Sequence, residues 1–344
     1  MLRTLAALAS LTLTAPAMAQ DEKAPDAPGP ADIVNAAPVE DWVMIPPEDL
    51  LVMTLAPDRD GDPREVVIQL TPEPFSQGWV ENIRTLARAR WYDGISVNRV
   101  QDNYVVQWGD PGHDNPESGE VDTKPLPEGL RVMEEEDYLA DPPFGGGNSP
   151  LTHYQGQPTA SSPTRVSGRI AFRGNPAWIG ESYWKGFPIA GELTPHGFPV
   201  WPVHCYGMVG VGRGYSPDTG TGAELYTVIG HAPRHLDRNI ALVGRIVEGM
   251  EHLSSLPRGS GALGFYTEKE ADLRTPITSI RVAADLPEDE HPRFEYLSTT
   301  SATFARYAEA RANRRDPFFI HSAGGADICN IPVPVRAVTN GGPE

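Results

Sequence analysis

The chain has 344 residues and a formal net charge of −18, from 28 Lys and Arg against 46 Asp and Glu. No basic stripe offsets this excess of acid, which argues against nucleic acid and anionic membrane surfaces as partners. The 35 Pro and 34 Gly residues interrupt helices and strands, so the composition favours a soluble, β-rich protein with many turns and long loops.

Residues 1–19 have the pattern of a secretory signal peptide. The run from Leu5 to Leu13 is apolar but too short to span a bilayer, and it is followed by Ala17-Met18-Ala19, a small-x-small cleavage site. We therefore expect export, a mature chain that starts at Gln20, and a periplasmic location. A membrane anchor is the alternative interpretation, although no later stretch of the sequence reaches the length of a membrane span.

Residues 20–41 are rich in Pro, Ala and acid and predict a disordered leader. Strands are expected at 50–55 and 65–70, joined as a hairpin by the acidic turn 58–62. This turn resembles the start of a calcium loop. However, Gln69 occupies the position of the closing bidentate Glu, which favours an ordinary turn.

Apolar residues at helical spacing predict a helix that begins at Pro74. After the turn at Gly94 come two short β-type runs, the first with Arg99 and the second with Gln107. These two polar residues are eight positions apart among aromatic and branched neighbours. They predict a shallow apolar pocket with two fixed hydrogen-bonding groups.

Residues 112–195 are loop-rich, with one strand expected at 166–172, and the acidic cluster 134–137 indicates a solvated face rather than a metal site. Further on, strands are expected at 225–229 and 240–247. A short helix at 248–256 and a strand at 277–282 follow, and another helix is expected at 301–314.

Three ligand or cross-link interpretations concern the region around Cys205. The glycines that follow it lack the ending of a phosphate loop, and the nearby His204, His231 and His235 do not have the spacing of a zinc-binding set. Cys205 and Cys329 are the two cysteines, and a bond between them in an oxidising compartment would contribute roughly 4 to 5 kcal/mol. Sequence alone does not bring their Cα atoms within bonding range, so a disulfide and two buried thiols both stay open.

Over residues 45–285 the chain resembles the cyclophilin-type peptidyl-prolyl isomerases. The motifs that carry the resemblance are Tyr92-Asp93-Gly94, Asn98-Arg99-Val100, Gln107-Trp108-Gly109-Asp110, Thr221-Gly222-Ala223-Glu224-Leu225-Tyr226 and Val243-Gly244-Arg245-Ile246-Val247-Glu248-Gly249-Met250. The resemblance implies a mainly β protein with a closed eight-stranded antiparallel barrel capped by two helices. This domain is expected at 42–285, with an enlarged loop insertion at 112–195 and a C-terminal helical extension at 286–344.

The resemblance also assigns the site. It implies that Arg99 is the catalytic residue and that Gln107 orients the substrate and Arg99. The positions that match peptide- or proline-binding residues of the family are Tyr104, Val105, Val209, Gly210, Val211, Glu224, Tyr226, His235 and Leu236. Each has a structural alternative, such as a surface salt bridge for Arg99 or plain core packing for Tyr226 and Leu236.

Peptidyl-prolyl isomerisation requires no cofactor or metal, because the catalyst has only to favour the twisted amide over the planar one. The resemblance therefore implies a prolyl isomerase that acts on proline-containing peptides or unfolded exported proteins. The alternative is a client-binding or chaperone module on the same barrel with weak or no isomerase activity. That alternative is motivated by departures from the family pattern at Asn98, Tyr104, Val105, Gly210 and Glu224.

Overall fold

The computed structural model describes residues 27–114, 118–119, 122–141, 165–166, 169–170, 180–192, 194 and 197–338. The expected signal peptide at 1–19 therefore lies outside the described residues.

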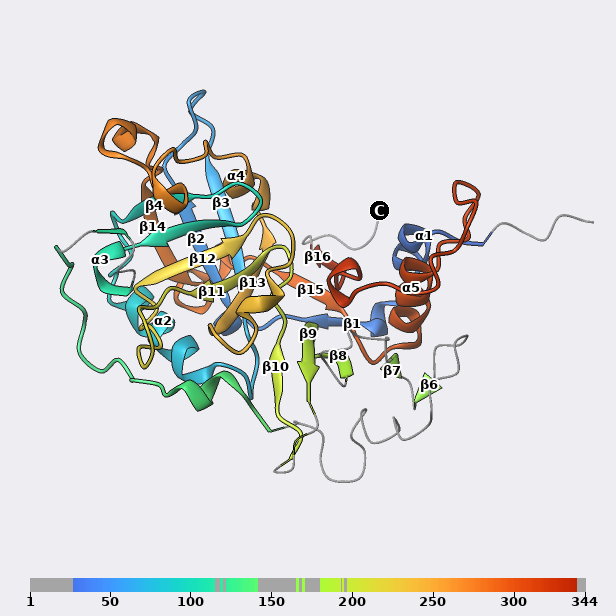
Figure 1. Ribbon diagram of the computed structural model, residues 1–344. Helices are drawn as coiled ribbons and strands as arrows, with labels where there is room; N and C mark the ends of the chain where they lie inside the picture. Colours follow the sequence, from blue (N-terminus) through green and yellow to red (C-terminus); the bar gives the residue numbers. More distant parts are fainter. Residues whose placement is uncertain are drawn as a thin grey trace, which may run out of the picture.

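An eight-stranded antiparallel sheet forms the body, in the order β14-β2-β3-β13-β11-β12-β5-β4 (Figure 1). Its strands are β2 (Leu50–Leu55), β3 (Arg64–Leu70), β4 (Ser96–Val100), β5 (Val105–Gly109), β11 (Met208–Val211), β12 (Glu224–Val228), β13 (Leu242–Glu248) and β14 (Ile277–Val282). The two edge strands meet, since the Val97 amide donates to the Thr275 carbonyl (2.9 Å) and the Ile277 amide to the Ile95 carbonyl (2.8 Å). The sheet is thus a nearly closed barrel, and the predicted barrel is confirmed.

The predicted hairpin at 50–70 is formed by β2 and β3, which pair from Leu50 opposite Gln69 to Leu55 opposite Arg64. Alternate residues of these strands, such as Met53 and Ile68, lie in the barrel core. The residues between them, Val52 and Val67, lie in a second core outside the barrel. Because both faces of the two strands are covered, their sequences are continuous apolar runs instead of alternating ones.

Two helices cap the barrel, as expected. Helix α2 (Gln77–Arg88) buries Trp79, Ile83 and Leu86 in the barrel core, and α4 (Met250–Ser254) buries Leu253 there. Helix α2 begins three residues later than predicted, because residues 72–75 form a turn in which the Phe75 amide donates to the Pro72 carbonyl.

The chain termini form a second layer beside the barrel (Figure 1). A three-stranded sheet pairs β1 (Trp42–Met44) with β15 (Phe294–Leu297), and β15 with β16 (Val335–Ala337). Two helices belong to the same core, α1 (Pro30–Asn35) and α5 (Ala302–Ala312). The predicted helix at 301–314 is therefore present, but the extension also contributes strands and is not purely helical.

The expectation of a disordered leader over 20–41 is wrong for its described part, residues 27–41. Residues Pro30–Asn35 form α1, and its Ile33 is buried against α5 and its neighbours. This segment has too few apolar residues to fold alone, but it packs on the apolar surface of α5, about 270 residues further along the chain. Local composition does not reveal such a distant partner.

The sequence did not predict a further three-stranded sheet. It consists of β8 (Gly180–Trp184) and β9 (Phe187–Gly191) from the insertion, and of β10 (Val200–Pro202), which follows the insertion. Lys185 and Gly186 both have positive φ, so β8 and β9 are joined by the two-residue turn that suits a twisted hairpin. In place of one strand at 166–172 there are two short paired strands, β6 (Arg165–Val166) and β7 (Arg169–Ile170).

Cys205 and Cys329 form a disulfide, with Cα atoms 5.1 Å apart. The bond links the segment before β11 to the C-terminal layer, and it resolves the alternative that the sequence left open. In the part of the chain that the structure describes, no helix has the length and apolar character needed to cross a membrane.

Candidate active site

Four predicted site residues stand in one row across four strands of the barrel. Arg99 on β4 is opposite Gln107 on β5, Gln107 is opposite Tyr226 on β12, and Tyr226 is opposite Gly210 on β11. Directly opposed residues of antiparallel strands share one face of the sheet. Their neighbours such as Trp108 fill the barrel core, so the row lies on the outer face.

A β-bulge determines the position of Arg99 in this row. Val97 pairs with Trp108 and Arg99 with Gln107, so Asn98 is an extra residue between them. A bulge redirects the side chains that follow it. Here it places Arg99 directly opposite Gln107, and the Arg99 Nη1 donates to the Gln107 Oε1 (3.0 Å).

The row borders a cavity of about 420 Å³. Six of the predicted site residues line it, namely Arg99, Tyr104, Val105, Gln107, Tyr226 and Leu236. These six residues combine an apolar or aromatic wall with the cation of Arg99 and the amide of Gln107.

The Arg99 guanidinium is held from several sides, and only 8% of the residue is exposed. Besides its bond to Gln107, its Nε donates to the Leu263 carbonyl (2.7 Å) and its Nη2 to the Gln101 Oε1 (2.5 Å). The guanidinium carbon also lies 5.7 Å from the ring centroid of Tyr104. The planar cation is thus fixed in orientation at the edge of the cavity.

Other predicted residues do not line the cavity. Val209 and Val211 are buried in the barrel core, because alternation along β11 turns them inward and leaves Gly210 on the outer face. Their side chains therefore do not line the cavity, and their expected role in peptide binding stays a prediction. Glu224 is fully buried and accepts a hydrogen bond from the Asn98 Nδ2 (3.1 Å), and the exposed His235 stacks on Tyr104 with centroids 6.4 Å apart.

The segment that lines the cavity beyond β11 is one that the sequence interpretation missed, Gly212-Arg213-Gly214. The Arg213 Nε donates to the Asn239 carbonyl (2.8 Å) and its Nη1 to the Gly214 carbonyl (2.7 Å). A second guanidinium therefore lies at the cavity. The available signal was the glycine-rich run itself, which leaves backbone groups uncovered. The remaining unpredicted lining residues are Gln101, Tyr215, Ile240 and Leu263.

Gly210 has a specific packing role. A Cβ atom at this position would overlap the Tyr226 ring and hydroxyl. The absence of a side chain lets the Tyr226 ring lie across β11, where it forms one wall of the cavity.

No three or more His, Cys, Asp or Glu side chains of the described residues are arranged to hold a metal ion. The chemistry that the cavity residues themselves offer is donation from a fixed, always charged guanidinium into an apolar notch. Such a group stabilises a developing lone pair or negative charge without giving up its proton. An eight-stranded antiparallel barrel with this outer-face site is the arrangement of a peptidyl-prolyl isomerase of the cyclophilin class.

Comparison with known families agrees. The family model "Cyclophilin type peptidyl-prolyl cis-trans isomerase/CLD" matches residues 61–282. Since this is more than half of the chain, the protein belongs to the cyclophilin-type peptidyl-prolyl cis-trans isomerase family. It is thus an enzyme of the isomerase class whose members bind proline-containing peptides.

A solved cyclophilin structure has a similar fold. The cyclophilin AquaCyp293 from Hirschia baltica is 19% identical, with a TM-score of 0.59 over 86% of this chain and 93% of that one. A cyclophilin-type isomerase of Cryptosporidium parvum is 11% identical and covers 68% of this chain and 96% of its own, with a TM-score of 0.36. A search among curated protein sequences gave no match.

Replacement of Gly210 by Ala should displace Tyr226 and perturb the cavity. We expect the free energy of unfolding to fall by about 1–3 kcal/mol, because a methyl group is forced into an occupied space. Binding of a proline peptide should also weaken. Denaturant unfolding and peptide titration measure the two effects. Gly325→Ala is the matched control, since nothing lies within 4 Å of a Cβ there; equal stability of the two variants would contradict the packing role.

Proposed function

We propose that the protein catalyses cis–trans isomerisation of X-Pro bonds in exported proteins, with Arg99 as the catalytic residue and Gln107 as the residue that orients it. The observation that carries this proposal is the fixed Arg99 guanidinium at the edge of an apolar cavity. Val105, Tyr226 and Leu236 provide the apolar surface on which a pyrrolidine ring would pack.

The chemistry follows from the amide bond. Rotation about it has a barrier of roughly 20 kcal/mol, because the nitrogen lone pair is delocalised into the carbonyl. In the twisted state the lone pair returns to the nitrogen, and a guanidinium N–H directed at that nitrogen stabilises the twisted state more than the planar one. No bond to the substrate is made or broken, and Arg99 keeps its proton throughout.

Arg99→Ala should lower kcat/KM for a proline-containing peptide by about 10²-fold or more, the usual effect of removing one positioned donor. Arg99→Lys should also be impaired, because an ammonium lacks the planar fork that Gln107, Gln101 and the Leu263 carbonyl hold. A protease-coupled assay on the mature chain measures both. Arg315→Ala, with an exposed side chain in the C-terminal segment, is the control. Wild-type rates in Arg99→Ala would exclude the proposed role.

Export of the protein is supported by two features, the signal-like residues 1–19 and the disulfide between Cys205 and Cys329. Disulfides persist in oxidising compartments such as the periplasm and are rare in the cytosol. We propose that the protein works there on newly exported chains.

The export proposal predicts a defined processed form. When the full-length chain is expressed in a Gram-negative host, the periplasmic fraction should contain a protein that starts at Gln20, as measured by mass spectrometry of the intact chain. Ala17→Asp or Ala19→Asp should block processing, because the cleavage site requires small residues. A cytosolic, unprocessed wild-type chain would refute it.

One observation favours the alternative function of client binding. The C-terminal segment exposes Phe318 (84%) and Ile320 (89%), which lie outside the residues matched to the family. Exposed apolar side chains next to each other are typical of surfaces that contact other proteins. They could hold an unfolded client independently of the isomerase site.

Client binding predicts that the protein suppresses aggregation of an unfolded model protein. The suppression should be unchanged in Arg99→Ala and reduced several-fold in Phe318→Ser/Ile320→Ser, as followed by light scattering. Isomerase activity should fall in Arg99→Ala and stay unchanged in Phe318→Ser/Ile320→Ser. Loss of suppression in Arg99→Ala, with Phe318→Ser/Ile320→Ser unaffected, would assign client holding to the isomerase cavity instead.

A further inference from the structure

A buried chain of hydrogen bonds starts at the wall of the cavity. The Tyr226 hydroxyl is 2.8 Å from the His204 Nε2, and the His204 Nδ1 is 2.8 Å from the Asp237 Oδ1. The side chains of His204 and Asp237 are completely buried, and Tyr226 is 4% exposed. These hydrogen bonds explain why His204, whose spacing to other histidines did not fit a zinc site, is buried.

The direction of these hydrogen bonds follows from Asp237. A carboxylate only accepts, so the proton of a neutral His204 ring is on Nδ1, and Nε2 is left as an acceptor. The Tyr226 hydroxyl therefore donates to His204. Burial raises the pKa of Tyr226 well above its usual value, so the hydroxyl keeps its proton. The hydroxyl is directed at His204 rather than at a bound peptide.

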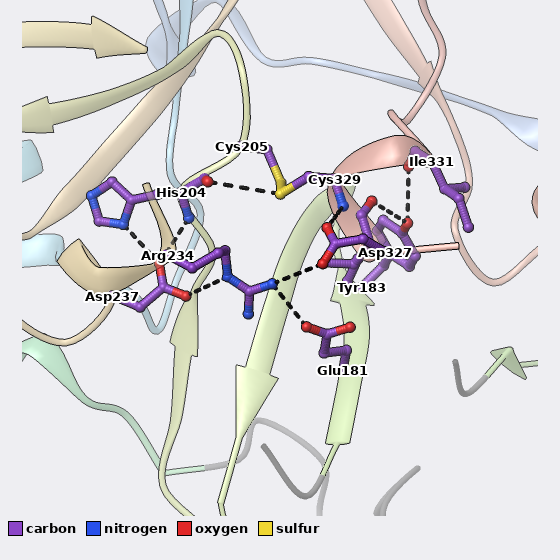
Figure 2. The surroundings of a disulfide bond; sticks show 10 residues. Glu181, Tyr183, His204, Cys205, Arg234, Asp237, Asp327, Cys329 and Ile331 are labelled. Carbon is purple, nitrogen blue, oxygen red and sulfur yellow. Dashed lines mark hydrogen bonds and ion pairs between the residues drawn. A yellow bond between two sulfur atoms is a disulfide. The ribbon is translucent and has the colours of Figure 1, made fainter. Parts of the chain in front are cut away.

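The far end of this hydrogen-bonded series is held by β8 of the insertion and by the C-terminal layer (Figure 2). The Arg234 Nε donates to the Asp237 Oδ2 (2.8 Å), and the Arg234 Nη1 donates to the Glu181 Oε1 on β8 (2.9 Å). His204 is followed directly by Cys205, which is bonded to Cys329 in the C-terminal layer. The backbone and side chain of His204 are thus both fixed.

We propose that His204 and Asp237 are positioning residues of the isomerase, which hold the Tyr226 ring in place as a wall of the proline-binding cavity. The proposal rests on the proposed function of this cavity. Tyr226 and His204 have nearly parallel rings (8° between planes, centroids 6.3 Å apart), and Gly210 leaves the space that the Tyr226 ring occupies. A wall that is already ordered before binding reduces the entropy that the peptide must lose.

The expected effect is on binding rather than on the rotation step. Arg99 is held by Gln107, Gln101 and the Leu263 carbonyl, none of which belongs to the chain that starts at Tyr226. Loss of His204 would leave the Tyr226 hydroxyl buried without an acceptor and turn the ring out of place. We therefore expect KM to rise while kcat stays within about twofold.

Two polar substitutions at His204 test this with little change in volume. The amide of Gln reaches the position of Nε2, so His204→Gln keeps an acceptor for the Tyr226 hydroxyl, whereas the amide of Asn reaches only the position of Nδ1. His204→Asn should raise KM about tenfold, a loss of about 1.4 kcal/mol of binding, and His204→Gln no more than threefold. His321→Asn, with an exposed side chain in the C-terminal segment, is the control.

A double-variant cycle gives a second, independent result. Tyr226→Phe/His204→Leu replaces both partners by apolar groups and leaves neither Tyr226 nor His204 polar and unpaired, so its KM should be at least threefold below that of His204→Leu alone. KM is also measured for Asp237→Asn. Thermal unfolding of every variant shows whether a change in KM merely follows a loss of stability. Unchanged KM in folded His204→Asn, or equal KM in His204→Asn and His204→Gln, overturns the positioning role.

The test also separates this inference from the proposed function. Arg99→Ala, measured beside the His204 variants, should lower kcat, whereas His204→Asn should raise KM. If Arg99→Ala retains full activity, the catalytic assignment fails while the KM results at His204 still support or overturn the positioning role. A fall of kcat in His204→Asn at unchanged KM counts against it.

Discussion

The register of four strands is the constraint on which the site depends. Arg99, Gln107, Tyr226 and Gly210 meet only because each is directly opposite the next across β4, β5, β12 and β11. Side chains alternate between the faces of a sheet, so a slip of one residue in any strand would turn its member of the row into the barrel core. The buried interior and the closure of β4 on β14 prevent such a slip. The core therefore determines the geometry of the site as well as the stability of the fold.

The second layer adds a different constraint, because it buries the other side of the barrel. Arg245 on β13 shows how closely the two parts fit. Its guanidinium is buried, donates to the Gln69 Oε1 and to the Gly186 carbonyl of the β8–β9 turn, and lies over the Phe187 ring. Burial lowers the pKa of Arg245 to about 10, which still leaves it charged at neutral pH. None of these contacts of the buried Arg245 is a carboxylate. Since a buried charge needs its hydrogen-bond partners, Arg245 links the β8–β9 turn of the insertion to the barrel.

Much of this arrangement could be predicted from the sequence where local signals were strong. Period-two and continuous apolar runs indicated the barrel strands, and the motif around Arg99 and Gln107 indicated two of the polar groups that line the cavity. The prediction failed where the signal was not local. Helix α1 is stabilised by α5, which is distant in sequence, and a short glycine-rich strand gives no alternation from which to judge that Val209 and Val211 point inward. The sequence interpretation therefore did not indicate that Gly212, Arg213 and Gly214, which follow β11, line the cavity.

The residue at position 226 shows what family motifs leave out. The resemblance matched Tyr226 to a proline-binding position, where an aromatic ring alone would make the hydroxyl a minor feature. In a buried wall it is not minor, because a hydroxyl removed from water needs a partner of its own. The partner is His204, which in turn needs Asp237, and the charge of Asp237 is balanced by Arg234. The single hydroxyl oxygen of Tyr226 thus accounts for the polar series His204, Asp237 and Arg234. This series ends at β8 of the insertion and next to the disulfide to the C-terminal layer.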